Sequence, residues 1–243
     1  MKLLLIRHGE PDYENDTITA KGVIEANHLA DKIKTMHIDE CYVSPLGRAR
    51  ATAAPSLKVL NKDEIILDWL REFSYKVPRP DAGGEMKVPW DWLPTDWTKN
   101  PIFYDKDNWM NYPLFVEYGI DVKAKEVIKE FDLFLKNHGY ERENEYYRAV
   151  KPSNDTVAFF CHFGLGCILM GHLIGASPMV LWHGLCAAPT SITTIATEER
   201  RKGYASFRTL SYGDVSHLYA ADEAPSFAAR FCECYGNEGE RID

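Results

Sequence analysis

A short apolar run near the start of the chain leads directly into a group of polar residues. Residues 3–6 have the composition of a strand buried on both faces, and Arg7, His8, Gly9 and Glu10 follow where it ends. Ligands of open parallel sheets bind beyond the carboxyl ends of the strands. A guanidinium binds phosphate oxygens in pairs, and a neutral imidazole is a competent nucleophile near pH 7. This group therefore has the residue types needed to bind an anion and attack it.

Two further predicted strands also end in polar residues. The run 38–43 is followed within five residues by Arg48, and the run 156–161 is followed at once by His162. If both strands are parallel neighbours of the first, these side chains meet the first group at one edge of the sheet. A pocket of two arginines and two histidines suits a phosphoryl group, whose transition state spreads negative charge over its oxygens.

Such a pocket also needs an acid that protonates the departing oxygen. Glu72 is the favoured candidate because it follows a third strand-like run at 65–67. Asp68 and Glu85 are alternatives near the expected rim of the pocket, and Glu10 is a weaker one.

Hydrophobic periodicity predicts the elements that position these residues. Helices are expected at residues 20–36, 46–59, 113–138, 164–174 and 224–234. Strands are expected at 190–197 and 204–211, antiparallel to each other, in addition to the runs named above. Pro55 is expected to kink or shorten the second helix. This alternation is typical of an α/β fold with a mostly parallel central sheet.

The segment 74–113 differs from the rest of the chain. It contains six prolines and many large aromatic rings, among them Trp90, Trp92, Trp97 and Trp109. Proline disfavours a long regular helix, and loops of this length in compact domains are usually lids or binding elements. We expect a lid that selects the substrate, with a purely structural aromatic subdomain as the alternative.

Length and composition limit the functions that need to be considered. With 243 residues, 45% of them hydrophobic and 26% charged, the chain suits one soluble α/β domain with insertions, or two small domains. The net charge of −8 argues against nucleic acid and anionic membranes as partners, but a local arginine cluster can still bind a small phosphorylated substrate. No apolar run reaches transmembrane length and no secretory signal pattern is present, so we expect a cytoplasmic protein. The spacing of the six cysteines and of the histidines predicts no metal site.

In their order and spacing, these residues resemble the histidine phosphatase superfamily, also called phosphoglycerate mutase-like. The resemblance rests on Arg7-His8-Gly9, Ser44-Pro45-Leu46 with Arg48 and Ala49, Leu70 with Glu72, and His162 after an apolar strand. It implies a single domain over residues 1–243, folded as a three-layer α/β sandwich with the segment 74–113 as a lid insertion.

The resemblance also implies a role for each residue. His8 is the nucleophile that becomes phosphohistidine, and Arg7, Arg48 and His162 hold the phosphoryl oxygens. Glu72 is the acid that later activates water as a base. The family's reaction uses no metal or other cofactor, and a homodimer is left open.

A few residues leave their role open. Phe163 follows the second histidine, at a position where many relatives have glycine. The phenylalanine adds a ring there but leaves the backbone N–H available. Thr19 serves equally as a helix N-cap or as a phosphate contact. His217 and Arg208 either line the pocket from the last strands or pack elsewhere.

Three functions are compatible with this pattern. A phosphatase that acts on a small phosphorylated metabolite through phosphohistidine is favoured. A phosphoglycerate mutase needs more cations over the pocket than the segment 74–113 supplies, and the mutase-type tyrosine-glycine and asparagine-lysine signature is missing there. A non-catalytic phospho-ligand binding protein is disfavoured because such proteins usually lose the nucleophile.

Overall fold

The computed structural model describes residues 1–229, and its centre is a seven-stranded sheet with the order β4-β9-β1-β10-β11-β8-β7. Its strands are β1 (Lys2–Arg7), β4 (Glu40–Val43), β7 (Tyr140–Glu143), β8 (Tyr146–Ala149), β9 (Thr156–Cys161), β10 (Ile192–Arg201) and β11 (Tyr204–Asp214). Strands β4, β9 and β1 are parallel, whereas β10, β11, β8 and β7 are added by antiparallel pairing. The parallel part is the part that the predicted site residues follow.

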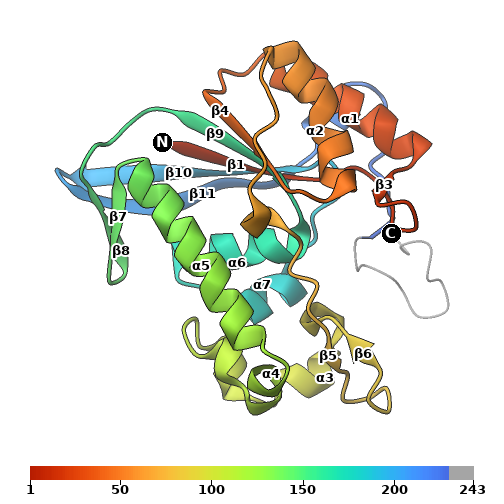
Figure 1. The fold of residues 1–243 in the computed structure, drawn as a ribbon, viewed down its shortest axis with the longest axis vertical. Coiled ribbons are helices and arrows are strands. Elements are labelled where there is room, and N and C mark those ends of the chain that lie inside the picture. Colours follow the sequence, from red (N-terminus) through yellow and green to blue (C-terminus); the bar gives the residue numbers. More distant parts are fainter. Residues whose placement is uncertain (230–243) are drawn as a thin grey trace.

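Helices cover both faces of the sheet. The helices are α1 (Ala20–Ile33), α2 (Gly47–Leu60), α3 (Pro94–Trp97), α4 (Pro113–Glu117), α5 (Ile120–Asn137), α6 (Phe163–Ile174), α7 (Pro178–Gly184) and α8 (Ser216–Tyr219). Helices α1 and α2 lie on one face, and α5 and α6 lie on the other (Figure 1). The expected three-layer α/β class is therefore confirmed, with a mixed central sheet. No helix of the described residues is long and apolar enough to span a membrane.

Strand β1 alternates between two hydrophobic cores, which explains why its apolar run has no polar gaps. Leu4 and Ile6 pack with residues of α1 and α2, whereas Leu3 and Leu5 pack with residues of α5 and α6. All four side chains are buried. A strand covered on both faces has no solvent side on which a polar residue would be tolerated.

The register of the parallel strands brings three chain segments to one edge of the sheet. Ile6 of β1 and Val43 of β4 both pair with Phe160 of β9, so the three strands end at the same level. The residues that follow these strands are His8, Ser44 and His162 in their respective loops. The predicted convergence of the strand ends is thus present.

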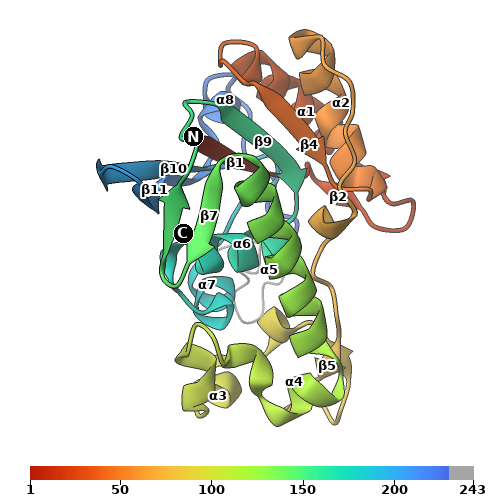
Figure 2. The ribbon, with the colours of Figure 1, turned by 60° about the vertical axis from the view of Figure 1, so that its left-hand side comes forward.

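Residues 74–113 fold as a lobe, called the aromatic lobe below, that lies beneath the sheet against α5 and α7 (Figure 1, Figure 2). It contains the hairpin β5 (Val77–Pro78) and β6 (Met86–Lys87), α3 and the 3₁₀ helices η2 (Pro89–Asp91), η3 (Pro101–Tyr104) and η4 (Trp109–Asn111). Trp92, Phe103 and Trp109 are buried there, in a core shared with α5, α6 and α7. Each of η2, α3 and η3 begins with a proline at its first position, where the missing N–H costs no helical hydrogen bond.

Several predicted elements differ from the structure. The helix expected at 113–138 is divided because Gly119, with φ of 72°, separates α4 from α5. The run 65–67 makes only a single bridge, from Ile66 to β4. Helix α2 is not shortened by Pro55. Residues 224–229 form no helix, and the rest of the helix expected at 224–234 lies outside the described residues.

Candidate active site

The two predicted histidines lie side by side at the shared edge of the strands. The centroids of the His8 and His162 rings are 5.2 Å apart, with their planes tilted by 55°. The backbone of His8 is held on both sides, since its N–H donates to the carbonyl of Cys161 at 3.1 Å and its carbonyl accepts from the N–H of Thr190 at 3.2 Å. Both rings are buried. The position of the first imidazole is therefore fixed by main-chain contacts to β9 and to the loop before β10.

Hydrogen bonding determines which nitrogen of His8 is free to react. The Nδ1 atom lies 2.8 Å from the carbonyl oxygen of Gly9, an atom that can only accept, so Nδ1 carries the proton. The lone pair of the ring is then on Nε2. Burial, and then the charge of Arg7, lower the pKa of His8 well below its ordinary value. The imidazole is therefore neutral at pH 7, as a nucleophile must be.

The glycine of the first motif is required by a close backbone approach. A Cβ atom on Gly9 would lie 2.9 Å from the carbonyl oxygen of Gly22 at the start of α1. The N–H of Gly9 donates to the hydroxyl of Thr52 at 2.9 Å, and that hydroxyl donates to the carbonyl of Arg48 at 2.7 Å. The loop after β1 is thus connected to the first turns of both α1 and α2.

Arg7 provides a buried guanidinium beside the histidines. Its two terminal nitrogens donate to the carbonyls of Ala187 and Ala229, and its charge lies 5.8 Å from the centroid of the Phe163 ring. Burial lowers the pKa of Arg7 from its ordinary value. The Nε atom is buried and has no partner among the described residues.

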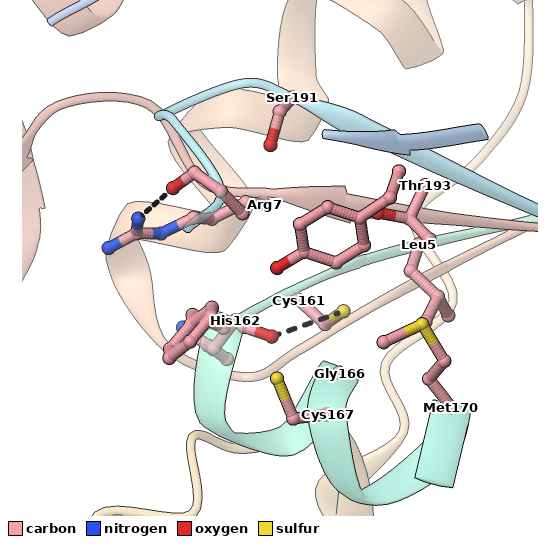
Figure 3. Close-up of a pocket in the computed structure, with 12 residues that line it drawn as sticks. Leu5, Arg7, Cys161, His162, Gly166, Cys167, Met170, Ser191 and Thr193 are labelled. Carbon is pink, nitrogen blue, oxygen red and sulfur yellow. Dashed lines mark hydrogen bonds between the residues drawn. The ribbon is translucent and has the colours of Figure 1, made fainter. Parts of the chain in front are cut away.

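A small cavity lies next to Arg7 and His162, toward the interior of the protein (Figure 3). Its volume is about 30 Å³, and Cys161, Cys167 and Met170 form part of its wall. His8 is absent from the lining. This cavity is too small for a phosphorylated metabolite, and we do not assign the phosphate position to it.

Arg48 is oriented by an aspartate that the sequence analysis missed. Its Nη1 lies 2.8 Å from Asp16 Oδ1, while Asp16 Oδ2 accepts from the N–H of Gly47 at 2.7 Å. One carboxylate therefore fixes both the start of α2 and the guanidinium. A Cβ atom on Gly47 would lie 2.0 Å from the carbonyl oxygen of Asp16, so a side chain there would push this contact apart. The Tyr13 ring lies 5.5 Å from the guanidinium carbon of Arg48.

His162 is the N-cap residue of α6, and its side chain is held by the end of β4. Its Nε2 lies 2.8 Å from the hydroxyl oxygen of Ser44. Burial, followed by the proximity of His8 and Arg48, lowers the pKa of His162 well below its ordinary value. The site thus combines two neutral imidazoles with two guanidinium groups.

Glu72 lies against the first turn of α6. Its Oε1 accepts from the N–H groups of Leu165 at 2.9 Å and Phe73 at 2.8 Å, and its Oε2 accepts from the N–H of Gly164 at 3.2 Å. It also exerts an electrostatic effect on Arg7. This carboxylate is therefore next to the residues that follow His162, on the side where Trp90 of the aromatic lobe packs against Gly164.

The alternative acids lie elsewhere. Asp68 and Glu85 are exposed at the surface, where they pair with Arg71 and Lys87. The Glu10 carboxylate accepts from the hydroxyls of Thr19 and Ser226.

Three other candidates also have defined contacts away from the histidine pair. Thr19 is the N-cap of α1, where its hydroxyl oxygen accepts from the N–H of Gly22 at 3.0 Å. Arg208 is exposed and pairs with Glu198 at 2.8 Å. His217 is buried and contacts Thr190 rather than the pocket itself.

Comparison with known proteins agrees with this arrangement. A model of the histidine phosphatase superfamily (branch 1) matches residues 3–101, which contain Arg7, His8, Arg48 and Glu72. Over these residues the chain is similar to the histidine phosphatase superfamily. His162 lies beyond the matched residues, and the sheet register is what brings it to the same edge.

Similar proteins extend the comparison to most of the chain. It is 24% identical over 233 residues to a probable phosphatase of Schizosaccharomyces pombe, covering 90% of this chain and 95% of the relative. It is 36% identical over 72 residues to a 2,3-bisphosphoglycerate-dependent phosphoglycerate mutase of Thermoplasma acidophilum, covering 26% of this chain and 36% of the mutase. A phosphoserine phosphatase of Entamoeba histolytica, solved with phosphoserine, has the same fold with a TM-score of 0.60 and 20% identity, over 89% of this chain and 98% of that one.

Proposed function

We propose that this protein is a member of the histidine phosphatase superfamily and hydrolyses the phosphomonoester of a small metabolite through a phosphohistidine on His8. The observation that supports this most directly is the free Nε2 lone pair of a buried, neutral His8 beside Arg7, Arg48 and His162. A dianionic phosphoryl group placed there meets two guanidinium charges and a nucleophile at the same point.

The reaction then proceeds in two balanced steps. In the first, Nε2 of His8 attacks phosphorus, the bond to the ester oxygen breaks, and the departing oxygen takes a proton from Glu72. The proton stays on Nδ1, and its hydrogen bond to the carbonyl of Gly9 stabilises the charged ring that forms. In the second, water loses its proton to Glu72 and attacks phosphorus, the N–P bond breaks, and inorganic phosphate leaves.

The relatives support a phosphatase over the alternatives. The yeast relative that is similar over most of its length is named a probable phosphatase, whereas the mutase is similar over 72 residues. The phosphoserine phosphatase with the same fold acts on a small phosphorylated molecule. We therefore propose a small phosphorylated metabolite as the substrate class, with the aromatic lobe as the element that selects it.

The proposal is tested by looking for both the intermediate and the product. Purified protein is incubated with ³²P-labelled phosphoesters of sugars, hydroxy acids and amino acids, then quenched and assayed for an acid-labile, alkali-stable protein label and for free phosphate. We expect both for at least one substrate. A label without phosphate release, together with conversion of 3-phosphoglycerate to 2-phosphoglycerate in the presence of the bisphosphate, would favour the mutase. Neither label nor phosphate release would indicate a binding protein.

A further inference from the structure

Thr190 is the residue that links the nucleophile loop to the last part of the described chain. Its N–H donates to the carbonyl of His8 at 3.2 Å, and its neighbour Ser191 accepts from the N–H of Arg7 at 3.0 Å. Thr190 has φ of 58°, in the left-handed region that a β-branched residue rarely adopts. A conformation of this kind persists only where its surroundings determine it.

His217 of α8 supplies part of those surroundings. Its Nε2 lies 3.1 Å from the hydroxyl oxygen of Thr190, and that hydroxyl donates its single proton to the carbonyl of Pro189 at 2.7 Å. The hydroxyl must therefore accept from His217, which places the proton of the imidazole on Nε2. Both side chains are buried.

Other contacts keep His217 in that state. Burial, and then the charge of Lys32, lower the pKa of His217 to about 4, while Asp214 opposes this effect and His28 adds to it. Lys32 itself binds Asp214 and the hydroxyl of Ser216, at the two ends of the turn that leads into α8. The ring is neutral at pH 7, and its Nδ1 has no partner among the described residues. Among the described residues, the side chain of His217 therefore has its hydrogen bond with Thr190.

We propose that His217 is a positioning residue for His8 and acts through Thr190. The inference rests on the proposed role of His8 as the nucleophile. The hydrogen bond from His217 holds Thr190 in its left-handed conformation, and the N–H of Thr190 then fixes the carbonyl of His8. The direction of the Nε2 lone pair depends on this backbone, because the same loop provides the Gly9 carbonyl that binds Nδ1.

Two single variants and one double variant test this path. His217→Leu and Thr190→Val each remove the bond while keeping an apolar group of similar size. We expect each to lower kcat by about tenfold to a hundredfold with little change in KM, since a displacement of about 1 Å at a reacting group has effects of that size. The double variant is expected to lose no more than the stronger single variant. His217→Gln, whose amide can donate from a similar position, is expected to recover most of the rate.

A matched control separates positioning from general damage. His28 lines the same cavity between α1 and α8 as His217, and the described contacts place it outside the path to Thr190. His28→Leu is expected to leave kcat unchanged. Equal losses in the His28 and His217 variants, or additive losses in the double variant, would overturn the proposal.

An NMR readout keeps the test independent of turnover. The imidazole ¹⁵N signals of His8 in the wild type are expected to report one tautomer, protonated on Nδ1. In Thr190→Val these signals are expected to broaden or shift toward a tautomer mixture. Because valine keeps the β-branched shape of threonine, this variant still provides the test if His217→Leu fails to fold. Unchanged His8 signals contradict the positioning role. An absence of label and hydrolysis in the wild type would instead contradict the proposed function, and the NMR comparison would still decide this inference.

Discussion

The His8 and His162 imidazoles lie 5.2 Å apart and are both kept neutral by burial and by the neighbouring arginines. The positive charge of the site therefore resides on Arg7 and Arg48. In the proposed reaction these two charges bind the phosphoryl dianion, while the lone pair of His8 stays available at neutral pH. The pairing explains why two histidines can adjoin two arginines in a buried space without accumulating four charges.

Acidification provides a direct test of this neutrality. The pKa of His8 is lowered in the folded protein, so its ring should stay neutral as the pH falls through 6.5, where an unperturbed imidazole becomes protonated. We expect the ¹³Cε1 shift of His8, assigned with a His8→Gln variant, to show no midpoint at or above pH 6.5. A His8 midpoint at or above pH 6.5 would contradict the assigned neutral state.

Removal of the nucleophile should stop the reaction without disturbing the fold. We expect His8→Ala to lower phosphate release by at least about 10³-fold and to abolish the acid-labile label, because the variant lacks the proposed nucleophile. Circular dichroism and the melting temperature should stay close to the wild type. His37→Ala, at a histidine whose side chain is 87% exposed, is the control and should retain full activity. Turnover by His8→Ala would show that another residue is the nucleophile.

The aspartate that orients Arg48 should matter for substrate binding. Asp16→Asn keeps an oxygen for the N–H of Gly47 but removes the charge that pairs with Arg48. A partly exposed pair of this kind is worth about 1 kcal/mol, so we expect KM to rise about fivefold. Asp12→Asn, at a half-buried position nearby in the chain where the carboxylate binds Asn15, should leave KM unchanged. An unaltered KM in Asp16→Asn would show that Arg48 does not need this partner.

The proposed acid can be identified from its dependence on the leaving group. We expect Glu72→Gln to slow hydrolysis of an alkyl phosphate by about 10²-fold or more, because the alkoxide needs a proton, and to slow p-nitrophenyl phosphate by less than about tenfold. The loss of a carboxylate that binds three backbone N–H groups should also lower the melting temperature.

The alternative acids provide the controls for this experiment. Glu85→Gln and Asp68→Asn change exposed carboxylates and should alter neither rate. An equal effect of Glu72→Gln on both substrates would assign Glu72 a structural role at the start of α6 rather than a proton-transfer role.

The sequence was most informative where a strand is buried on both faces. The apolar runs of β1 and β9 have no polar gaps, so the residues that follow them could be identified as strand ends, and the register then brings His8 and His162 together. Asp16 was missed because its contact with Arg48 depends on a turn in which Asp16 itself has φ of 45°. No periodic pattern records such a turn.

Other errors have the same physical origin. The hairpin of β7 and β8 consists of charged and tyrosine residues at the edge of the sheet, where one face is partly exposed and the hydrophobic pattern is weak. The single helix expected at 113–138 is divided at Gly119, whose left-handed conformation a periodicity count does not detect. The role of His217 depends on a contact between the loop before β10 and α8, which only the folded chain brings together.

The shared core of the aromatic lobe has a consequence for the exchange of specificity between relatives. Trp90 packs against Phe163 of α6 and Trp182 of α7, and the side-chain N–H of Trp182 donates to the carbonyl of Gly164 at 2.9 Å. A chimera in which residues 74–113 alone were replaced would lose these contacts with α6 and α7. The loss would occur next to the turn that bears His162. A transplantable unit must therefore contain the lobe together with α5, α6 and α7, the helices that share its core.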